Sequence, residues 1–304
     1  MTTVSVPTAD APDLLGDLPD GVRVVVWDGH GEPPDGAQDI ELFVGRYDTP
    51  PPSRDVFEAL PRLRVVQLVS AGVEPWLPVV PDGVVLCNGR GIHGASTAEL
   101  AVAGMLALLR RLPEAVDAQR RHDWHRAFTD GLAGRHVLVI GAGDIGARIA
   151  AAARVFDAET TMVARTERDG VHPLAALPDL LPRHEVVAVA VPQTPDTAGL
   201  VDATFLAAMP DGAILVNIAR GGIVDTDALL AELQAGRLRA FLDVTDPEPL
   251  PAGHPLWDAP GLLLTPHVGG GTTGWDRRAY RLVTDQIRRY VTGDELVNRV
   301  TDGY

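Results

Sequence analysis

Short apolar runs rich in β-branched residues alternate with helical patterns along most of the chain. In the first third, strand-like runs cover residues 22–27, 40–45, 63–69 and 83–88, and a connecting helix is expected over 52–63. Strands that alternate with helices are typical of an α/β fold with parallel sheets.

A second alternation begins at His136. Strands are expected over 136–140, 160–164, 185–192, 213–219, 239–245 and 261–267, with helices over 145–156, 202–209 and 226–236. These runs predict a doubly wound parallel sheet of about six strands. Polar and glycine-rich segments follow several of the strands, and in such a sheet those segments meet at one edge, where ligands bind.

Two further helices indicate where the chain divides. One is expected over 96–113, with capping-box spacing between Ser96 and Glu99 and with Pro113 at its end. The other follows a glycine-rich stretch and covers 275–293. A length of 304 residues suits two domains. We therefore predict a discontinuous domain, 1–96 with 271–304, and a second domain over 97–270.

Charge and composition exclude several classes of function. A net charge of −15 argues against binding to nucleic acid or to an anionic membrane. All 26 cationic residues are arginine, so no lysine can act as a base or form a Schiff base. The single cysteine, Cys87, excludes an internal disulfide. No signal peptide is evident, and the longest apolar stretch, 101–109, is too short to span a bilayer, so we expect a cytoplasmic protein.

A glycine-rich turn connects the strand at 136–140 with the following helix. Gly141, Gly143 and Gly146 have the G-x-G-x-x-G spacing. The first glycine allows a tight turn, the second lets the backbone approach a pyrophosphate, and the third lets helix and strand pack closely. The motif predicts a dinucleotide site at the N-terminus of that helix, which makes 97–270 the dinucleotide-binding domain.

The residues after the second strand bear on the choice of dinucleotide. An acidic residue that binds the ribose of NAD is expected there, but the chain has Arg165 and Thr166, with Arg168 close by. An arginine beside a hydroxyl suits a 2′-phosphate, so we favour NADP over NAD. Alternatively, Arg165 stacks on adenine or points into solvent, and NAD is used.

Three charged residues follow three of the later strands. Arg220 has the planar fork that pairs with a carboxylate, and His267 can exchange a proton with a substrate oxygen. Glu248 is a candidate to hydrogen-bond His267, fix its orientation and favour its protonated form, although spacing alone leaves Asp246 as an alternative. The histidines and carboxylates show no metal-ligand spacing, so no metal site is expected.

Taken together, these segments resemble the D-isomer-specific 2-hydroxyacid dehydrogenase family. The resemblance runs from about Val22 to Val300 and includes GAGDIG, VPQTPDTAGLVD, ILVNIARGGIVDTDALL, AFLDVTDPEPLPAGHPLW and LLLTPHVGG. It implies two Rossmann-like domains with a cleft between them, and a catalytic triad of Arg220, Glu248 and His267. The implied reaction interconverts a small 2-keto acid, such as glyoxylate, hydroxypyruvate or a bulkier analogue, and its D-2-hydroxy acid.

The resemblance also implies roles for other residues. In the first domain, the backbone of Ala71 and Gly72 would bind the substrate carboxylate alongside Arg220, and Arg46 is a candidate for the far end of the substrate. Asp243 would hydrogen-bond the nicotinamide carboxamide. The remaining candidate cofactor residues are Asp144, Ile145, Pro192, Ile218, Ala219, Gly269 and Gly270.

Two features leave alternatives open. Thr245 stands where an aromatic residue commonly follows the Asp-Val pair, so the pocket wall is expected to be more open or more polar.

The segment 115–132 is expected to be a solvated arm or, alternatively, a surface where Trp124 meets a second subunit of a homodimer. Trp124 is flanked there by His122, His125 and Arg126. A cofactor-sensing binding module with little catalysis is the alternative function, and the complete triad argues against it.

Overall fold

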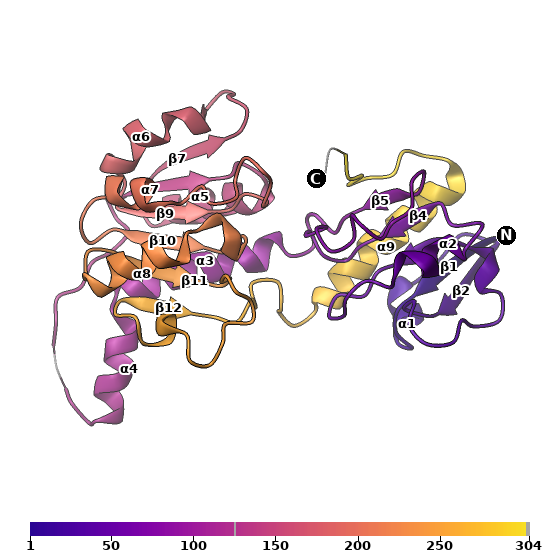
Figure 1. Cartoon of the computed structure of the whole chain (residues 1–304), viewed down its shortest axis with the longest axis horizontal. Coiled ribbons are helices and arrows are strands. Elements are labelled where there is room, and N and C mark those ends of the chain that lie inside the picture. The colour runs from indigo at the N-terminus through magenta and orange to yellow at the C-terminus, as the bar shows by residue number, and fades with distance from the viewer. Residues whose placement is uncertain (125, 302–304) are drawn as a thin grey trace. The chain divides into compact units, whose positions relative to one another are not determined.

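The chain forms two compact units in a computed structural model that describes residues 1–124 and 126–301 (Figure 1). Unit 1 comprises Met1–His93 and Gly271–Tyr304, and unit 2 comprises Gly94–Gly270. Helix α3 (Gly94–Leu109) opens unit 2, so the first crossing lies before Gly94, whereas the sequence placed it at Ser96–Thr97.

Unit 1 contains a parallel sheet of five strands in the order β2-β1-β3-β4-β5. The strands are β1 (Thr2–Val6), β2 (Val22–Val26), β3 (Ile40–Val44), β4 (Val65–Gln67) and β5 (Val85–Cys87). The helices are α1 (Ala11–Leu15), α2 (Arg54–Glu58) and α9 (Trp275–Thr292). Strand β1 and helix α1 were not predicted from the sequence.

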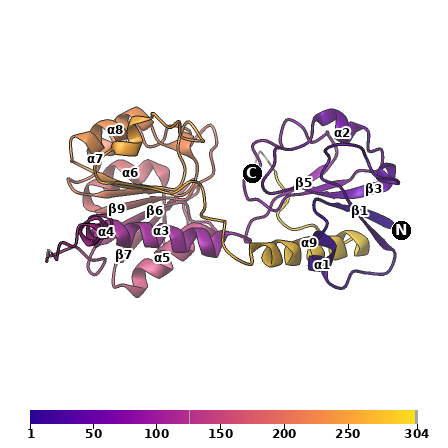
Figure 2. The same cartoon turned by 90° about the horizontal axis from the view of Figure 1, so that it is seen from below.

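Side chains alternate between the two faces of this sheet. Leu42 and Val44 of β3 pack against α1 and α9, while Ile40 and Phe43 pack on the other face near Phe57 of α2 (Figure 2). Helix α9 is attached to this sheet although it lies at the other end of the chain. Its buried Gln286 donates a hydrogen bond to Gln67 of β4, at 2.7 Å.

Unit 2 contains a sheet of seven strands in the order β12-β11-β10-β9-β6-β7-β8, all parallel. The strands are β6 (His136–Ile140), β7 (Glu159–Ala164), β8 (Val171–Pro173), β9 (Val186–Val189), β10 (Ile214–Asn217), β11 (Arg239–Leu242) and β12 (Leu262–Leu264). The remaining helices are α4 (Leu112–Arg120), α5 (Asp144–Val155), α6 (Leu177–Leu180), α7 (Ala203–Ala208) and α8 (Thr226–Gln234). The sheet thus has one strand more than predicted, because β8 was missed.

Helices cover both faces of this second sheet. Helices α3 and α5 pack on the face that presents Val137 and Val139, and α7 and α8 pack on the face that presents Leu138 and Ile140 (Figure 2). The strand order reverses between β6 and β9, and such a reversal is where ligands bind in open parallel sheets.

Two predictions about helix ends were wrong. Ser96 is not an N-cap, because α3 already begins at Gly94 and Ser96 lies buried in its first turn. Pro113 does not end a helix, since it stands in the first turn of α4, where its fixed φ is tolerated. Helix α4 has no buried residue, and the exposed Trp124 follows it. His125, predicted to flank Trp124, lies outside the described residues.

A buried histidine ties α6 to β7. His184 is 4% exposed, its Nδ1 lies 2.7 Å from the Leu180 carbonyl oxygen, and its Nε2 lies 3.0 Å from the Thr161 hydroxyl. The carbonyl can only accept, so Nδ1 carries the proton and Nε2 accepts from Thr161 in the neutral ring. Burial lowers the pKa of His184 below its ordinary value, because the charged form loses its hydration.

This histidine should make the stability of the protein depend on pH. Between its lowered folded pKa and the unfolded value of about 6.5, the unfolded chain binds more protons, so stability falls as pH falls through that window. We expect the free energy of unfolding to decrease from about pH 7.5 to about pH 5.5, and His184→Gln to reduce this slope. Urea denaturation of each protein at both pH values measures the free energy of unfolding and so gives the slope. The exposed His172→Gln serves as control, and an unchanged slope in His184→Gln would contradict the assignment.

Candidate active site

The residues Arg220, Glu248 and His267 follow three adjacent strands of unit 2. They come after β10, β11 and β12, which are neighbours in the sheet. The Nδ1 atom of His267 lies 2.5 Å from Oε1 of Glu248, and both side chains are partly exposed. The carboxylate that contacts the histidine is therefore that of Glu248. This contact fixes the ring and leaves Nε2 as the nitrogen available to a ligand.

A buried carboxylate holds the loop that presents His267. Asp243, at the end of β11, is 2% exposed and accepts three hydrogen bonds: from the Thr265 hydroxyl at 2.6 Å, from the Val268 amide at 2.9 Å and from the Gly269 amide at 2.8 Å. The His267 amide also donates to the Asp243 carbonyl, at 2.7 Å. His267 has φ +53°, an unfavourable backbone conformation that these bonds stabilise. The sequence had suggested only a cofactor role for Asp243.

A buried amide shapes the loop that carries Arg220. Asn217, at the end of β10, is 1% exposed, and its side chain accepts from the Ala219 amide at 3.1 Å and donates to the Arg220 carbonyl at 2.9 Å. One Arg220 guanidinium nitrogen donates to the Ala219 carbonyl at 2.7 Å. Asn217 was not predicted from the sequence, although a polar residue at the end of an apolar strand is a signal that could have identified it.

The glycine-rich loop has the geometry that a pyrophosphate requires. Gly141 has φ +114°, and a Cβ there would clash with the Ala190 carbonyl oxygen. A Cβ on Gly146 would clash with the Gly141 carbonyl oxygen, whereas a Cβ on Gly143 would meet only open space. The backbone at Gly143 is therefore approachable, and α5 begins at once with Asp144 and Ile145, whose amides have no intrahelical acceptor. These residues fit a dinucleotide.

Arg165 and Thr166 follow β7 and are exposed. Among the described residues, Arg165 forms no ion pair. Arg168 reaches back to the glycine-rich loop and donates to the Ala142 carbonyl at 2.7 Å. Arg168 thus contacts the glycine-rich loop, and Arg165 lies three residues before Arg168 in the chain.

The other candidate cofactor residues lie at the ends of neighbouring strands. Pro192 follows β9, and its carbonyl accepts from the Thr197 hydroxyl at 2.6 Å. Ile218 and Ala219 follow β10 and are buried, as are Gly269 and Gly270 beyond His267. All five therefore come from the carboxyl edge of the sheet.

In unit 1, the loop after β4 presents unused backbone donors. The Ala71 carbonyl accepts from the Asn88 side chain at 3.3 Å, and the Gly72 carbonyl accepts from the Ser70 hydroxyl at 3.0 Å. The amides of Ala71 and Gly72 donate to no other described residue. With carbonyls engaged and amides unused, this loop suits an anion.

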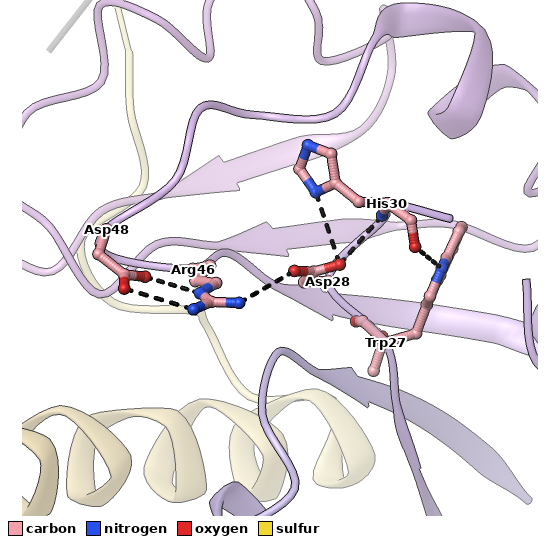
Figure 3. Close-up of polar contacts among 6 residues, drawn as sticks. Trp27, Asp28, His30, Arg46 and Asp48 are labelled. Atoms are coloured by element: carbon pink, nitrogen blue, oxygen red, sulfur yellow. Dashed lines mark hydrogen bonds and ion pairs between the residues drawn. The ribbon is translucent and has the colours of Figure 1, made fainter. Parts of the chain in front are cut away.

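Arg46, in the loop after β3, is held by two carboxylates (Figure 3). Its Nε donates to Asp48 at 2.6 Å, and its Nη1 donates to Asp28 at 3.3 Å. These pairs weaken the prediction that Arg46 binds the far end of a substrate.

Neither a metal site nor a membrane span is present in the part of the chain described. Residues 1–124 and 126–301 contain no cluster of three or more histidine, cysteine or carboxylate side chains arranged for a metal ion. None of their helices combines the length and the apolar character needed to cross a bilayer.

Comparison with known proteins places this geometry in a family. The sequence model described as "D-isomer specific 2-hydroxyacid dehydrogenase, NAD binding domain" matches residues 102–269, which is more than half of the chain. The chain belongs to the D-isomer specific 2-hydroxyacid dehydrogenase family. Within this family, it is 34% identical over 260 residues to the D-3-phosphoglycerate dehydrogenase of Mycobacterium bovis, covering 82% of this chain and 49% of that protein. The chain thus spans about half the length of that relative.

Solved structures of the family match along the whole chain. A D-isomer specific 2-hydroxyacid dehydrogenase from Xanthobacter autotrophicus Py2, in complex with NADPH and MES, superposes with a TM-score of 0.85 at 31% identity, covering 100% of this chain and 99% of that chain. The NADPH-dependent glyoxylate/hydroxypyruvate reductase of Sinorhizobium meliloti, in complex with NADP and sulfate, gives a TM-score of 0.84 at 26% identity, covering 100% of both chains. The two-domain α/β fold expected from the sequence is therefore confirmed.

Replacing Asp243 with asparagine should destabilise the His267 loop. Asparagine has one side-chain acceptor oxygen where Asp243 offers two, so at least one of the donors it binds would face an NH₂ group. We expect the free energy of unfolding to fall by about 1–3 kcal/mol. Urea denaturation measures it, with the exposed Asp258→Asn as control. Equal stability of the two variants would show that Asp243 does not support the loop.

Proposed function

We propose that this protein is an oxidoreductase that uses NADP to interconvert a small 2-keto acid and its D-2-hydroxy acid. The observation that carries the proposal is the Glu248–His267 pair, set at the carboxyl edge of the sheet that also bears the glycine-rich loop. A histidine held by a carboxylate and partly open to solvent suits proton exchange with a substrate oxygen. The family membership supports the same reaction class.

Each residue has a distinct role in this proposal. The cofactor supplies or accepts the hydride at C2 of the substrate. His267 donates a proton to the C2 oxygen during reduction and removes it during oxidation, while Glu248 binds Nδ1 and orients the ring. Arg220 binds the carboxylate and polarises the carbonyl oxygen. We assign the amides of Ala71 and Gly72 in unit 1 to binding a carboxylate.

The preference for NADP rests on the residues after β7. A 2′-phosphate carries negative charge and acceptor oxygens, which the exposed Arg165, Thr166 and Arg168 can bind. Two structural relatives support this assignment, since one was solved with NADPH and the other with NADP.

We also propose that the protein is a homodimer that pairs through unit 2. The segment around α4 supports this, because α4 has no buried residue, and Trp124 and Phe128, which follow it, are 93% and 106% exposed. Large apolar side chains in such a segment are characteristic of a surface that another subunit covers.

Replacing His267 with alanine should abolish turnover and leave cofactor binding intact. General acid–base catalysis contributes roughly 10²- to 10⁴-fold, so kcat should fall by that factor. The loss of absorbance of reduced nicotinamide, with glyoxylate, hydroxypyruvate or phenylpyruvate, measures it. Glu248→Gln should also reduce kcat, whereas Asp246→Asn should not. Unchanged turnover in His267→Ala would refute the assigned role.

Replacing Arg165 with alanine should weaken the binding of NADPH but not that of NADH. A charge-assisted hydrogen bond is worth about 1.5–3 kcal/mol, so the KM for NADPH should rise roughly tenfold or more while that for NADH stays the same. Steady-state kinetics with each cofactor measures this, and Arg154→Ala, an exposed arginine of α5, is the control. Equal changes for both cofactors would mean that Arg165 does not bind the 2′-phosphate.

A further inference from the structure

The carboxyl edge of the sheet in unit 1 brings three loops together. Strands β3, β4 and β5 are adjacent and parallel, so the loops that follow them lie side by side. These loops cover residues 45–48, 68–73 and 88–93. The middle one carries the unused amides of Ala71 and Gly72, and the outer two therefore flank any acid bound to those amides.

Three rings from separate segments stack at this edge. The centroid of Tyr47 lies 4.8 Å from that of Trp275 and 5.1 Å from that of His93, and the His93 and Trp275 rings are 5.9 Å apart. We call Tyr47, His93 and Trp275 the aromatic cluster. His93 is buried, whereas Tyr47 is 37% exposed and Trp275 is partly exposed, so the cluster presents ring surface to solvent.

The aromatic cluster is attached to the loop that carries the amides. Nε2 of His93 lies 2.9 Å from the carbonyl oxygen of Val69, just before Ser70. On the other side, Arg278 of α9 donates to the Ile92 carbonyl at 3.1 Å and fixes the backbone next to His93. His93 is therefore bonded to the loop that carries the amides, and Tyr47 and Trp275 pack near its ring.

Two carboxylates and one guanidinium lie on the Tyr47 side of the aromatic cluster, and the guanidinium of Arg278 lies on the His93 side. Asp28 and Asp48 both pair with Arg46, the residue next to Tyr47, so two carboxylates surround one guanidinium (Figure 3). The hydrogen bond from Arg46 lowers the pKa of Asp48, which keeps this carboxylate ionised. A second anionic group near Tyr47 would meet these two carboxylates and find Arg46 already engaged.

From these contacts we propose that unit 1 selects monoanionic 2-keto acids with an aromatic or branched apolar substituent. The aromatic cluster binds the substituent, and the Asp28–Arg46–Asp48 group disfavours substrates with a second carboxylate or a phosphate. This inference rests on the proposed function in one respect, which is that the amides of Ala71 and Gly72 bind the keto-acid carboxylate. It assigns to Arg46 a structural pairing instead of a substrate contact.

Binding without turnover tests the aromatic half of the proposal. The oxidised cofactor holds no hydride for a keto acid, so calorimetry on the full chain with NADP⁺ reports binding alone. Wild-type protein should bind phenylpyruvate more tightly than glyoxylate. Ring contacts of this kind imply that Trp275→Ala weakens the affinity for phenylpyruvate roughly five- to tenfold. The affinity for glyoxylate should change less than about twofold. Trp275→Phe should restore most of the affinity, and Trp257→Ala, an exposed tryptophan of unit 2, is the control.

A substitution that should improve binding tests the electrostatic half. Asp48→Asn removes one carboxylate from Arg46, so oxaloacetate, which has a second carboxylate, should bind roughly three- to tenfold more tightly than to wild type. Phenylpyruvate affinity should not change. Asp20→Asn, an exposed carboxylate elsewhere in unit 1, is the control.

The outcomes separate this inference from the proposed function. The inference would be overturned if Trp275→Ala lost equal affinity for phenylpyruvate and glyoxylate, or if Asp48→Asn gained no affinity for oxaloacetate. Either result would overturn it even if the enzyme reduces keto acids. Absence of any keto-acid binding to wild type would overturn it as well. If the expected binding pattern holds but reduced cofactor gives no turnover, the proposed function fails and the binding preference stands.

Discussion

The buried carboxylate of Asp243 is the group on which the candidate active site depends. It stands at the end of β11, where the chain would otherwise leave the sheet, and its oxygens bind the loop after the neighbouring β12. Burying a charge is unfavourable unless it is well hydrogen-bonded, and here three donors meet it. His267 can therefore adopt a left-handed backbone conformation and still point toward Glu248. Asp243 thus fixes the loop that carries the proposed acid–base residue.

The parallel sheets explain why the chemistry of each unit gathers at one edge. In unit 2 the loop after β6 offers helix amides and open space at Gly143, while the loops after β10, β11 and β12 offer a cation, a carboxylate and a histidine. In unit 1 the corresponding edge offers unused amides and aromatic rings. Buried polar side chains such as Asn217 and Gln67 hold these edges in shape, because each satisfies backbone groups that the ends of strands leave unpaired.

Much of this arrangement was predictable from the sequence, and the exceptions have physical causes. Long apolar runs marked most strands correctly, and the spacing of the glycines predicted the turn before α5. Strand β1 was missed because Thr3 and Ser5 are polar, although both are buried. Strand β8 has only three residues, which is too short for a periodic signal. The start of α3 was misplaced because Ser96 and Glu99 have capping spacing but lie inside the helix. Sequence spacing alone left Glu248 and Asp246 equivalent; the family resemblance favoured Glu248, and the fold shows that Glu248 contacts His267.

A crystal structure of the full chain with NADPH and oxamate, a keto-acid mimic that is not reduced, tests the central claim most directly. The account predicts that the pyrophosphate lies on the Gly141–Gly146 loop and that the oxamate carboxylate contacts Arg220. It also predicts that the oxamate carbonyl oxygen accepts a hydrogen bond from His267 Nε2. Oxamate bound away from His267, or a cofactor bound away from the glycine-rich loop, would contradict it.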